Sequence, residues 1–354
     1  MSQLVRQLVR VRRGAVVLAV AGAALTGPVQ AAVAAAEDDS PSSFTVDDPR
    51  ITESSGIAAS RAHKGVYWTH NDSDDGPYVY AVDSRTGKTV ARVTLQGVDP
   101  RDVEAISVGP DGDVYVGDIG DNLGGEWPEV WIHRFREPEE LHDQTVDTTS
   151  YTVRYADGPR DAESMMVHPR TGRVYIASKS SEGKGAIYEG PAEMSESGVN
   201  TFRRIARTDV WASDGAFSPD GTRLVLRSYF NGKMYDWSDG APSPLGRVTV
   251  PMQGQGESVT FAPDGRTLMY GSEGERSTVE PVELDGKLLP KNAAHEKQDD
   301  GSQDGAQGGQ NDDAQNDGKG GAGDNALVKA GVTFAVAIGL WMVLKKTFTR
   351  RRSD

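Results

Sequence analysis

The 354-residue sequence contains no cysteine, which excludes disulfide frameworks, thiolate nucleophiles and thiolate metal ligands. It also has fewer basic than acidic residues, with 38 Lys and Arg against 52 Asp and Glu and a formal net charge of −14. Binding of nucleic acid requires clustered Lys and Arg, and the central region has no such cluster. We therefore expect no nucleic-acid partner.

Common catalytic motifs are also missing. Residues 37–290 contain no Gly-x-Ser-x-Gly elbow, no His-Glu-x-x-His zinc motif and no Walker loop. Any hydrolysis would therefore need a metal ion to activate water. A long apolar pattern with the 3.6-residue period of a helix is missing from residues 55–289, which consist of short strand-like runs and turns. These features predict an all-β domain with little helix.

One pattern occurs five times along the chain: a leading polar residue, an apolar run, a tight turn and a second apolar run. Such a pattern is typical of two antiparallel strands, and in three copies the turn is Pro-Asp-Gly. The spacing of 43 to 59 residues between copies is close to that of four-stranded propeller blades. We therefore predict a β-propeller over residues 44–290. It has five blades, or six if residues 127–155 hide extra strands, and residues 44–51 supply a strand that completes the last blade.

Both ends of the chain carry targeting patterns. Residues 1–36 combine a basic start, an apolar run and a small-residue end, as in a signal peptide, with an uncleaved anchor as the alternative. Residues 291–325 are rich in Gly, Gln, Asn and Asp, and this composition predicts a disordered acidic linker. Residues 326–344 are apolar and long enough for one transmembrane helix, and the basic tail 345–354 favours a cytoplasmic C-terminus. We therefore expect a single-pass protein of the cell membrane with an extracellular propeller.

The leading residues of the five copies define a candidate metal site. If the first strands surround one axis, their starts meet at one mouth of the central channel. Converging carboxylates repel one another, and Ca²⁺ suits a flexible set of oxygen ligands. Alternatively, these residues cap strand starts, pair with cations of the mouth or accept backbone hydrogens, and the sequence leaves both readings open. The candidate metal ligands are Ser55, Glu104, Glu163, Asp214 and Glu257.

The second strands of the copies end at the same mouth and supply further candidates. We expect the two cations among them, Lys179 and Arg227, to engage a negative group of a ligand. His70 and Asp118 are candidate general bases, although a single His beside a carboxylate is more commonly a structural residue. The candidate ligand-binding residues are Asn71, Asp72, Asp121, Asn122, Lys179, Arg227 and Glu273.

Four motifs within residues 51–273 resemble those of secreted bacterial β-propellers of the WD40-like and esterase-like phytase group. They are His-Asn-Asp-Ser at 70–73, Gly-Asp-Ile-Gly-Asp-Asn at 117–122, Asp-Gly-Pro-Arg-Asp-Ala-Glu at 157–163 and Gly-Gln-Gly-Glu at 254–257. The order Ser, Glu, Glu, Asp, Glu is also similar to the calcium ring of five-bladed calcium-activated nucleotidases. That resemblance implies a Ca²⁺ site made by the five leading residues, with Asp214 where a hydroxyl is expected.

Two functions follow from these patterns. The first is an extracellular binding module whose acidic mouth, loaded with Ca²⁺, receives a small anionic or carbohydrate-like ligand or a protein loop. The second is a metal-dependent phosphoester or ester hydrolase, in which the ion activates water and His70 or Asp118 is the base. A scaffold without a small-molecule site is a third possibility.

Overall fold

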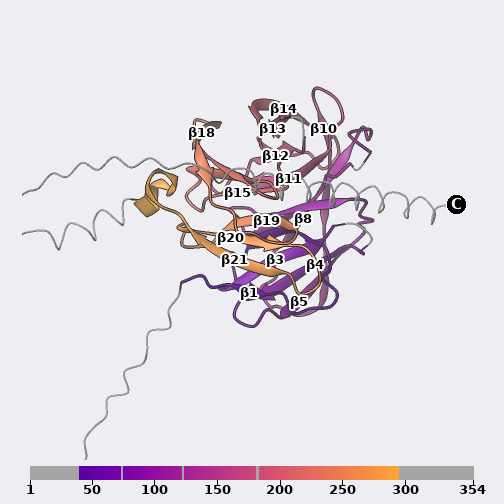
Figure 1. Cartoon of the computed structure of the whole chain (residues 1–354). Coiled ribbons are helices and arrows are strands. Elements are labelled where there is room, and N and C mark those ends of the chain that lie inside the picture. Colours follow the sequence, from indigo (N-terminus) through magenta and orange to yellow (C-terminus); the bar gives the residue numbers. More distant parts are fainter. Residues whose placement is uncertain (1–39, 73–74, 122, 181–182, 295–354) are drawn as a thin grey trace, which may run out of the picture. The chain divides into compact units, whose positions relative to one another are not determined.

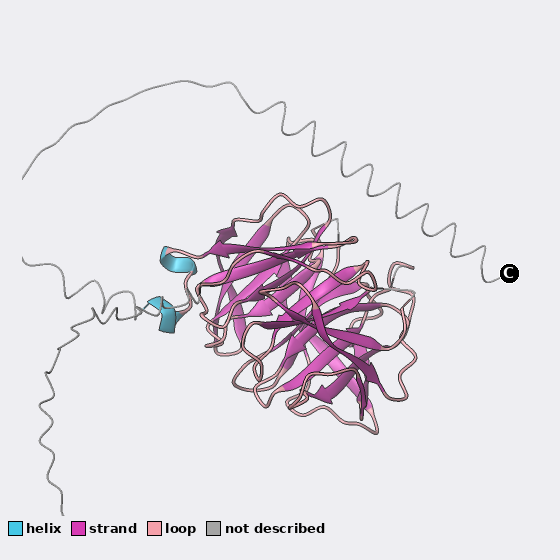
Figure 2. Cartoon of the chain, turned by 90° about the horizontal axis from the view of Figure 1, so that it is seen from below, coloured by secondary structure: helices cyan, strands magenta, loops and turns pink. Residues whose placement is uncertain are grey.

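The computed structural model describes residues 40–72, 75–121, 123–180 and 183–294 (Figure 1). The predicted signal peptide, transmembrane segment, basic tail and nearly all of the linker lie outside these residues. In the part that is described, no helix has the length and apolar character needed to cross a membrane. Strands make up most of this part, and its helical residues are η1 (Gly286–Leu288) and the turn at 291–294 (Figure 2).

The first sheet has the strand order β2-β3-β4-β5-β9, in which only the last pair is parallel. Its strands are β2 (Ser54–Ala59), β3 (Val66–Asn71), β4 (Tyr78–Asp83), β5 (Thr89–Leu95) and β9 (Gln144–Val146). The segment 127–155 therefore adds β9 to the outer edge of this sheet. The other strands of that segment are β8 (Val130–Arg136) and β10 (Thr149–Tyr155), and both belong to the eight-stranded sheet that follows.

The second and third groups form one eight-stranded sheet, because their outer strands β10 and β14 pair in parallel. The second group consists of β6 (Val103–Val108), β7 (Asp113–Asp118), β8 and β10. The third group consists of β11 (Ala162–Val167), β12 (Val174–Ser178), β13 (Gly185–Glu189) and β14 (Val199–Thr208).

The remaining two sheets have four strands each. One contains β15 (Asp214–Phe217), β16 (Arg223–Arg227), β17 (Gly232–Ser238) and β18 (Ala241–Val248). The other contains β19 (Gly256–Phe261), β20 (Thr267–Ser272), β21 (Thr278–Glu283) and the N-terminal β1 (Phe44–Thr45). Phe44 pairs with Val279, which confirms that the first strand of the domain completes the last sheet.

The first strands of the five groups, β2, β6, β11, β15 and β19, are the inner strands. Each contacts the next, and β19 contacts β2, so the cycle closes. Four inner strands are buried along nearly their whole length, because other sheets cover both faces, and β15 is buried at its first two residues. In contrast, β5 and β10 alternate between buried and more exposed residues. The domain therefore has an all-β, propeller-like fold.

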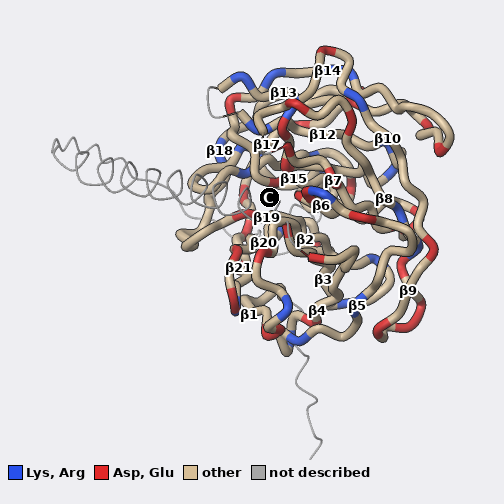
Figure 3. Tube along the Cα trace, turned by 90° about the vertical axis from the view of Figure 1, so that its right-hand side faces the viewer, with Lys and Arg blue, Asp and Glu red and all other residues tan. Residues whose placement is uncertain are grey.

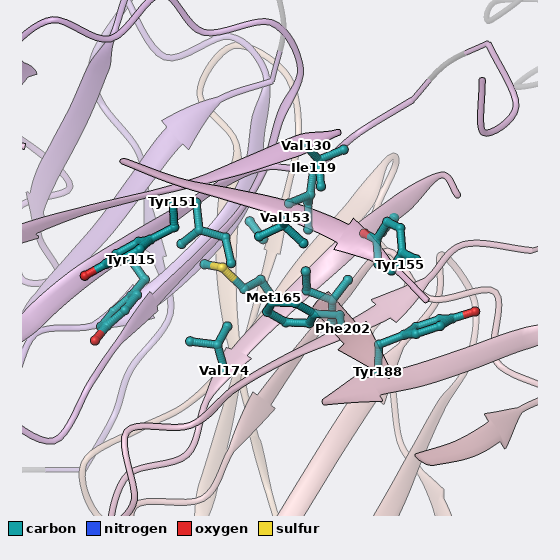
Figure 4. Packing of buried hydrophobic residues seen from close by; sticks show 14 of the residues in the cluster. Tyr115, Ile119, Val130, Tyr151, Val153, Tyr155, Met165, Val174, Tyr188 and Phe202 are labelled. Atoms are coloured by element: carbon teal, nitrogen blue, oxygen red, sulfur yellow. The ribbon is translucent and has the colours of Figure 1, made fainter. Parts of the chain in front are cut away.

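The hydrophobic core lies between adjacent groups of strands. Figure 4 shows the cluster between the second and third groups, where Val153, Met165 and Phe202 pack together. All three side chains are fully buried, and removing one such side chain from water stabilises the fold by about 1.5–3 kcal/mol. This packing fixes the inner strands beside one another and so fixes the side chains at their ends.

Candidate functional site

Four of the five inner strands are irregular at the residue that leads the repeat. The pairing of β6 with β7 shifts register between Val103 and Ala105, which makes Glu104 the extra residue of a β-bulge. Comparable shifts surround Ser55, Glu163 and Glu257. Because a bulge re-aims the side chain of the extra residue, these four side chains leave the regular alternation of their strands at the same end of the inner strands.

Asp214 differs from the other leading residues. It stands in regular register opposite Arg227, and its carboxylate accepts the backbone N–H groups of Gly215 and Val259, both at 2.7 Å. Burial raises the pKa of Asp214 well above its usual range, and the two backbone donors counteract part of that shift. Since Val259 belongs to β19, this carboxyl group ties two neighbouring inner strands together. This arrangement favours the structural reading of Asp214.

Glu104 belongs to a group of three carboxyl groups. One carboxylate oxygen from each of Asp72, Asp102 and Glu104 lies within 4.8 Å of the other two. Burial raises the pKa of Glu104 well above its usual range, and repulsion from Asp72 and then Asp102 raises it further. Holding this group ionised therefore requires nearby positive charge.

The close approach of these carboxyl groups depends on Gly120. A Cβ atom at Gly120 would stand 2.5 Å from Oδ2 of Asp102 and 2.8 Å from Cγ of Glu104. Two oxygen ligands on opposite sides of a Ca²⁺ ion are about 4.6–5.2 Å apart, whereas the smaller Mg²⁺ requires about 4.0–4.2 Å. The distance bound of 4.8 Å allows either ion, and the all-oxygen donor set of Asp72, Asp102 and Glu104 is of the kind that hard cations bind.

Lys179 supplies positive charge beside this group. Its ammonium group forms an ion pair with Glu163 and donates a hydrogen bond to the hydroxyl of Tyr229 at 3.1 Å. The same ammonium lies 5.7 Å from the ring centre of Trp211 and 5.5 Å from that of Tyr229. It also lowers the pKa values of Glu104 and Glu257, which burial raises. Lys179 thus acts as an internal counter-ion.

Glu257 and Glu273 form the other side of the mouth. Burial and then repulsion from Glu273 raise the pKa of Glu257 to about 8. Glu273 accepts hydrogen bonds from the Ser55 hydroxyl, at 3.3 Å, and from the side-chain amide of Gln255. The predicted mouth residues Ser55, Glu257 and Glu273 therefore lie together. Figure 3 shows acidic and basic segments side by side around β6 and β15.

Three other predicted residues organise the backbone at this end. Asp118 accepts the N–H groups of Arg101 and Asp102 at 3.1 and 2.8 Å, and Asp121 accepts that of Trp127 at 2.7 Å. Asn71 accepts two backbone N–H groups from the segment before β2. These contacts hold the loops that carry the carboxyl groups. Asn122 lies outside the described residues.

His70 and Arg227 are placed inside the sheets. His70 is 1% exposed, its Nδ1 bonds to the carbonyl of Asn71 at 2.9 Å, and burial lowers its pKa. Arg227 is fully buried and donates to the carbonyls of Ser258 and Gly271 at 2.8 and 3.1 Å. Both placements favour structural roles, and the predicted roles of His70 as a base and Arg227 as a ligand contact stay predictions.

Several residues of the mouth were not predicted from the sequence. Asp102 and Asp161 each stand two residues before a predicted glutamate, in Asp-Val-Glu at 102–104 and Asp-Ala-Glu at 161–163, so this repeated spacing could have revealed them. Trp211 and Tyr229 have no such signal. Their rings stack edge to face at 5.2 Å, and Tyr229 reaches the mouth from the β16–β17 loop.

No family model and no curated protein matches the sequence. Solved structures with a similar fold include the PQQ-bound aldose sugar dehydrogenase of Streptomyces coelicolor, with 12% identity, a TM-score of 0.41 and coverage of 69% of this chain and 98% of that one. A gluconolactonase of Xanthomonas campestris has 16% identity, a TM-score of 0.41 and coverage of 70% and 80%. The WD40 repeats of RRP9 have 13% identity, a TM-score of 0.36 and coverage of 65% and 67%.

Proposed function

We propose that the domain is a five-bladed extracellular binding module whose acidic mouth binds Ca²⁺ and, through the ion, a ligand with a negative or polyhydroxyl group, or a protein loop. The closed cycle of five inner strands supports the number of blades. The signal-peptide pattern of residues 1–36 and the apolar segment 326–344 support an exported domain anchored in the membrane.

The imbalance of charge at the mouth carries this proposal. Among the described residues, seven carboxyl groups interact with one another or with Lys179. They are Asp72, Asp102, Glu104, Asp161, Glu163, Glu257 and Glu273. Three positive charges act on this set, from Lys179, from Arg227 beside Glu257 and from Arg101 beside Asp102. Three cations do not balance seven carboxyl groups, so the remaining charge is met by bound protons or by a bound cation. A divalent ion at Asp72, Asp102 and Glu104 would lower the energy of the ionised state.

The ion would also explain how an acidic mouth holds an anionic ligand. Arg227 already donates to backbone carbonyls and Lys179 already pairs with Glu163, so an added cation would give a ligand a positive partner that the protein does not already use. A bound Ca²⁺ ion with six to eight oxygen ligands has positions left after three carboxyl groups have bound. Carboxylate, phosphate or hydroxyl oxygens of a ligand would fill those positions.

A calcium titration tests the proposal. An ion that binds only the folded protein raises the free energy of unfolding by about 2.7 kcal/mol at one hundred times its Kd. We expect added Ca²⁺ to raise the melting temperature and EDTA to reverse the rise. Glu104→Gln should remove most of this response, whereas the exposed control Glu139→Gln should keep it. An identical melting temperature in Ca²⁺ and in EDTA would refute the metal site.

A second candidate function is a metal-dependent phosphoester or ester hydrolase. The observation that favours it is the pKa of about 8 for Glu257, since a carboxyl group that titrates near neutral pH is suited to general acid–base catalysis. In this case the ion would activate water and Glu257 would transfer the proton. Calcium-dependent turnover of a phosphoester or ester panel, lost in both Glu104→Gln and Glu257→Gln, would establish the enzyme. If no compound of the panel is turned over, the binding module stays the proposed function.

A further inference from the structure

The inner strands enclose a second pocket at the end opposite to the acidic mouth. We call it the far pocket. Its volume is about 460 Å³, and all five inner strands and their hairpin turns line it. Four repeats contribute a proline from the turn, and the first repeat contributes an arginine instead. These turn residues are Arg61, Pro110, Pro169, Pro219 and Pro263.

The wall of the far pocket has mixed polarity. Most of its lining residues are apolar, among them Ile57, Ile106, Val167 and Phe261, but these four are largely buried in the packing between strand groups, and polar atoms supply about half of the exposed surface. No Asp or Glu is among its lining residues. The turn residue Asp264 accepts the backbone N–H of Arg266 and the hydroxyl of Thr267. The carboxyl groups of such turns therefore serve local hydrogen bonds and do not form the wall. Hydroxyl groups of Ser60, Ser107 and Thr260 add polar atoms to it.

Arg61 is the one charged residue of this wall. Its side chain is exposed and forms no hydrogen bond or ion pair within the described residues. The charge of Glu137 acts on Arg61. The carboxylate of Glu137 already accepts the indole N–H of Trp68 at 2.6 Å, the backbone N–H of Ala62 at 3.1 Å and the Ser60 hydroxyl. The guanidinium group of Arg61 therefore keeps its donors for a ligand.

We propose that the far pocket binds a small molecule with an apolar body and one negative group, such as an aryl-substituted or aliphatic carboxylate. Its volume falls within the range of small-molecule sites, and a wall of mixed polarity with one charged anchor offers contacts to both the apolar body and the negative group of such a molecule. The guanidinium fork pairs with a carboxylate through two parallel hydrogen bonds. The ligand differs from that of the acidic mouth, and its binding does not require Ca²⁺.

Calorimetric titration of the full-length protein with 4-phenylbutyrate tests this proposal. We expect saturable binding that is the same in Ca²⁺ and in EDTA. The uncharged 4-phenylbutanol should bind at least about tenfold more weakly, because a charge-assisted hydrogen bond contributes a factor of this size. Binding of the alcohol as tight as that of the carboxylate would overturn the role of charge, and no binding of 4-phenylbutyrate would overturn the proposal.

Two matched variants locate the site. Arg61→Gln should weaken the binding of 4-phenylbutyrate by about tenfold or more and leave the binding of 4-phenylbutanol unchanged. The control Arg170→Gln removes the same charge from an exposed arginine that does not line the far pocket, and it should bind as the wild type does. Ala59→Trp fills the pocket and should abolish binding of both probes. Equal weakening by Arg61→Gln and Arg170→Gln would contradict the proposal.

Discussion

The two ends of the inner strands have opposite chemistry although the same five strands build both. At one end, β-bulges direct Glu104, Glu163 and Glu257 into a mouth of buried carboxyl groups around Lys179. At the other end, prolines of the hairpin turns surround a pocket that has no lining carboxyl group and one cation, Arg61. The comparison shows how a repeat separates chemistry in space, because its first residue reaches one end of every strand and its turn reaches the other.

The largest expected effect is at the acidic end. Gly120→Ala places a methyl group 2.5 Å from an oxygen of Asp102 and should force the carboxyl groups of Asp72, Asp102 and Glu104 apart. We expect calcium affinity to fall by about 100-fold, as when the surroundings of a metal ligand are disturbed. Isothermal titration measures the affinity. Gly124→Ala is the control, because a Cβ atom there has open space around it, and only its calcium affinity is compared. A fall in calcium affinity as large as that of Gly120→Ala would contradict the prediction.

Asp214 tests whether all five leading residues share one role. Asp214→Ala removes the acceptor of two buried backbone N–H groups and should lower the free energy of unfolding by about 1–3 kcal/mol per unsatisfied group. Calcium affinity should change little, because Asp214 is tied to β19. Denaturant unfolding and calcium titration of the same sample measure both quantities. A large loss of calcium affinity without loss of stability would place Asp214 among the ligands.

The pH dependence of stability tests the charge of the mouth. Burial and repulsion from Glu273 raise the pKa of Glu257 to about 8 in the folded protein, whereas its ordinary pKa is 4.5. Folding therefore takes up a proton at this group between these values, and the contribution of Glu257 to stability falls as the pH rises from 4.5 to 8. In EDTA, Glu257→Gln should melt above the wild type by about 3 °C or more at pH 8 and by much less at pH 5. A difference independent of pH would refute this.

The smallest effect is expected where the two ends are independent. Arg61→Gln removes a side chain without a hydrogen bond or ion pair among the described residues, so the free energy of unfolding should change by no more than about 0.5 kcal/mol. Calcium affinity at the mouth should be that of the wild type. Thermal unfolding and calcium titration check both. A change in calcium affinity would show that the two ends are coupled through the inner strands.

Local patterns predicted much of the fold. The apolar runs and the Pro-Asp-Gly turns indicated the first two strands of each repeat, because strand period and turn chemistry are properties of neighbouring residues. β18 was harder to predict, since Pro242 and Pro244 argue against a strand, and it is tolerated as an outer strand. The parallel pairing of β10 with β14 joins residues about 50 positions apart and has no local signal.

The candidate site also has features that the sequence predicted and features that it did not. The sequence predicted which residues lead the repeats, and the structure brings Ser55, Glu257 and Glu273 together as expected. It did not predict that Asp214 would bind the backbone of β19, or that Asp102 would join Asp72 and Glu104. Those outcomes depend on β-bulges and on the fit of Gly120 against two carboxyl groups.

By itself, the sequence determined the strands, the turns and the residue types available at each end of them. The tertiary structure alone decided which carboxyl groups face one another, which are used by the backbone, and that Arg61 joins four prolines around the far pocket. The physical reason is the distance along the chain over which each kind of interaction acts. Strand and turn preferences act between adjacent residues, whereas burial, repulsion and hydrogen bonding depend on distances that exist only after the five inner strands have closed their cycle.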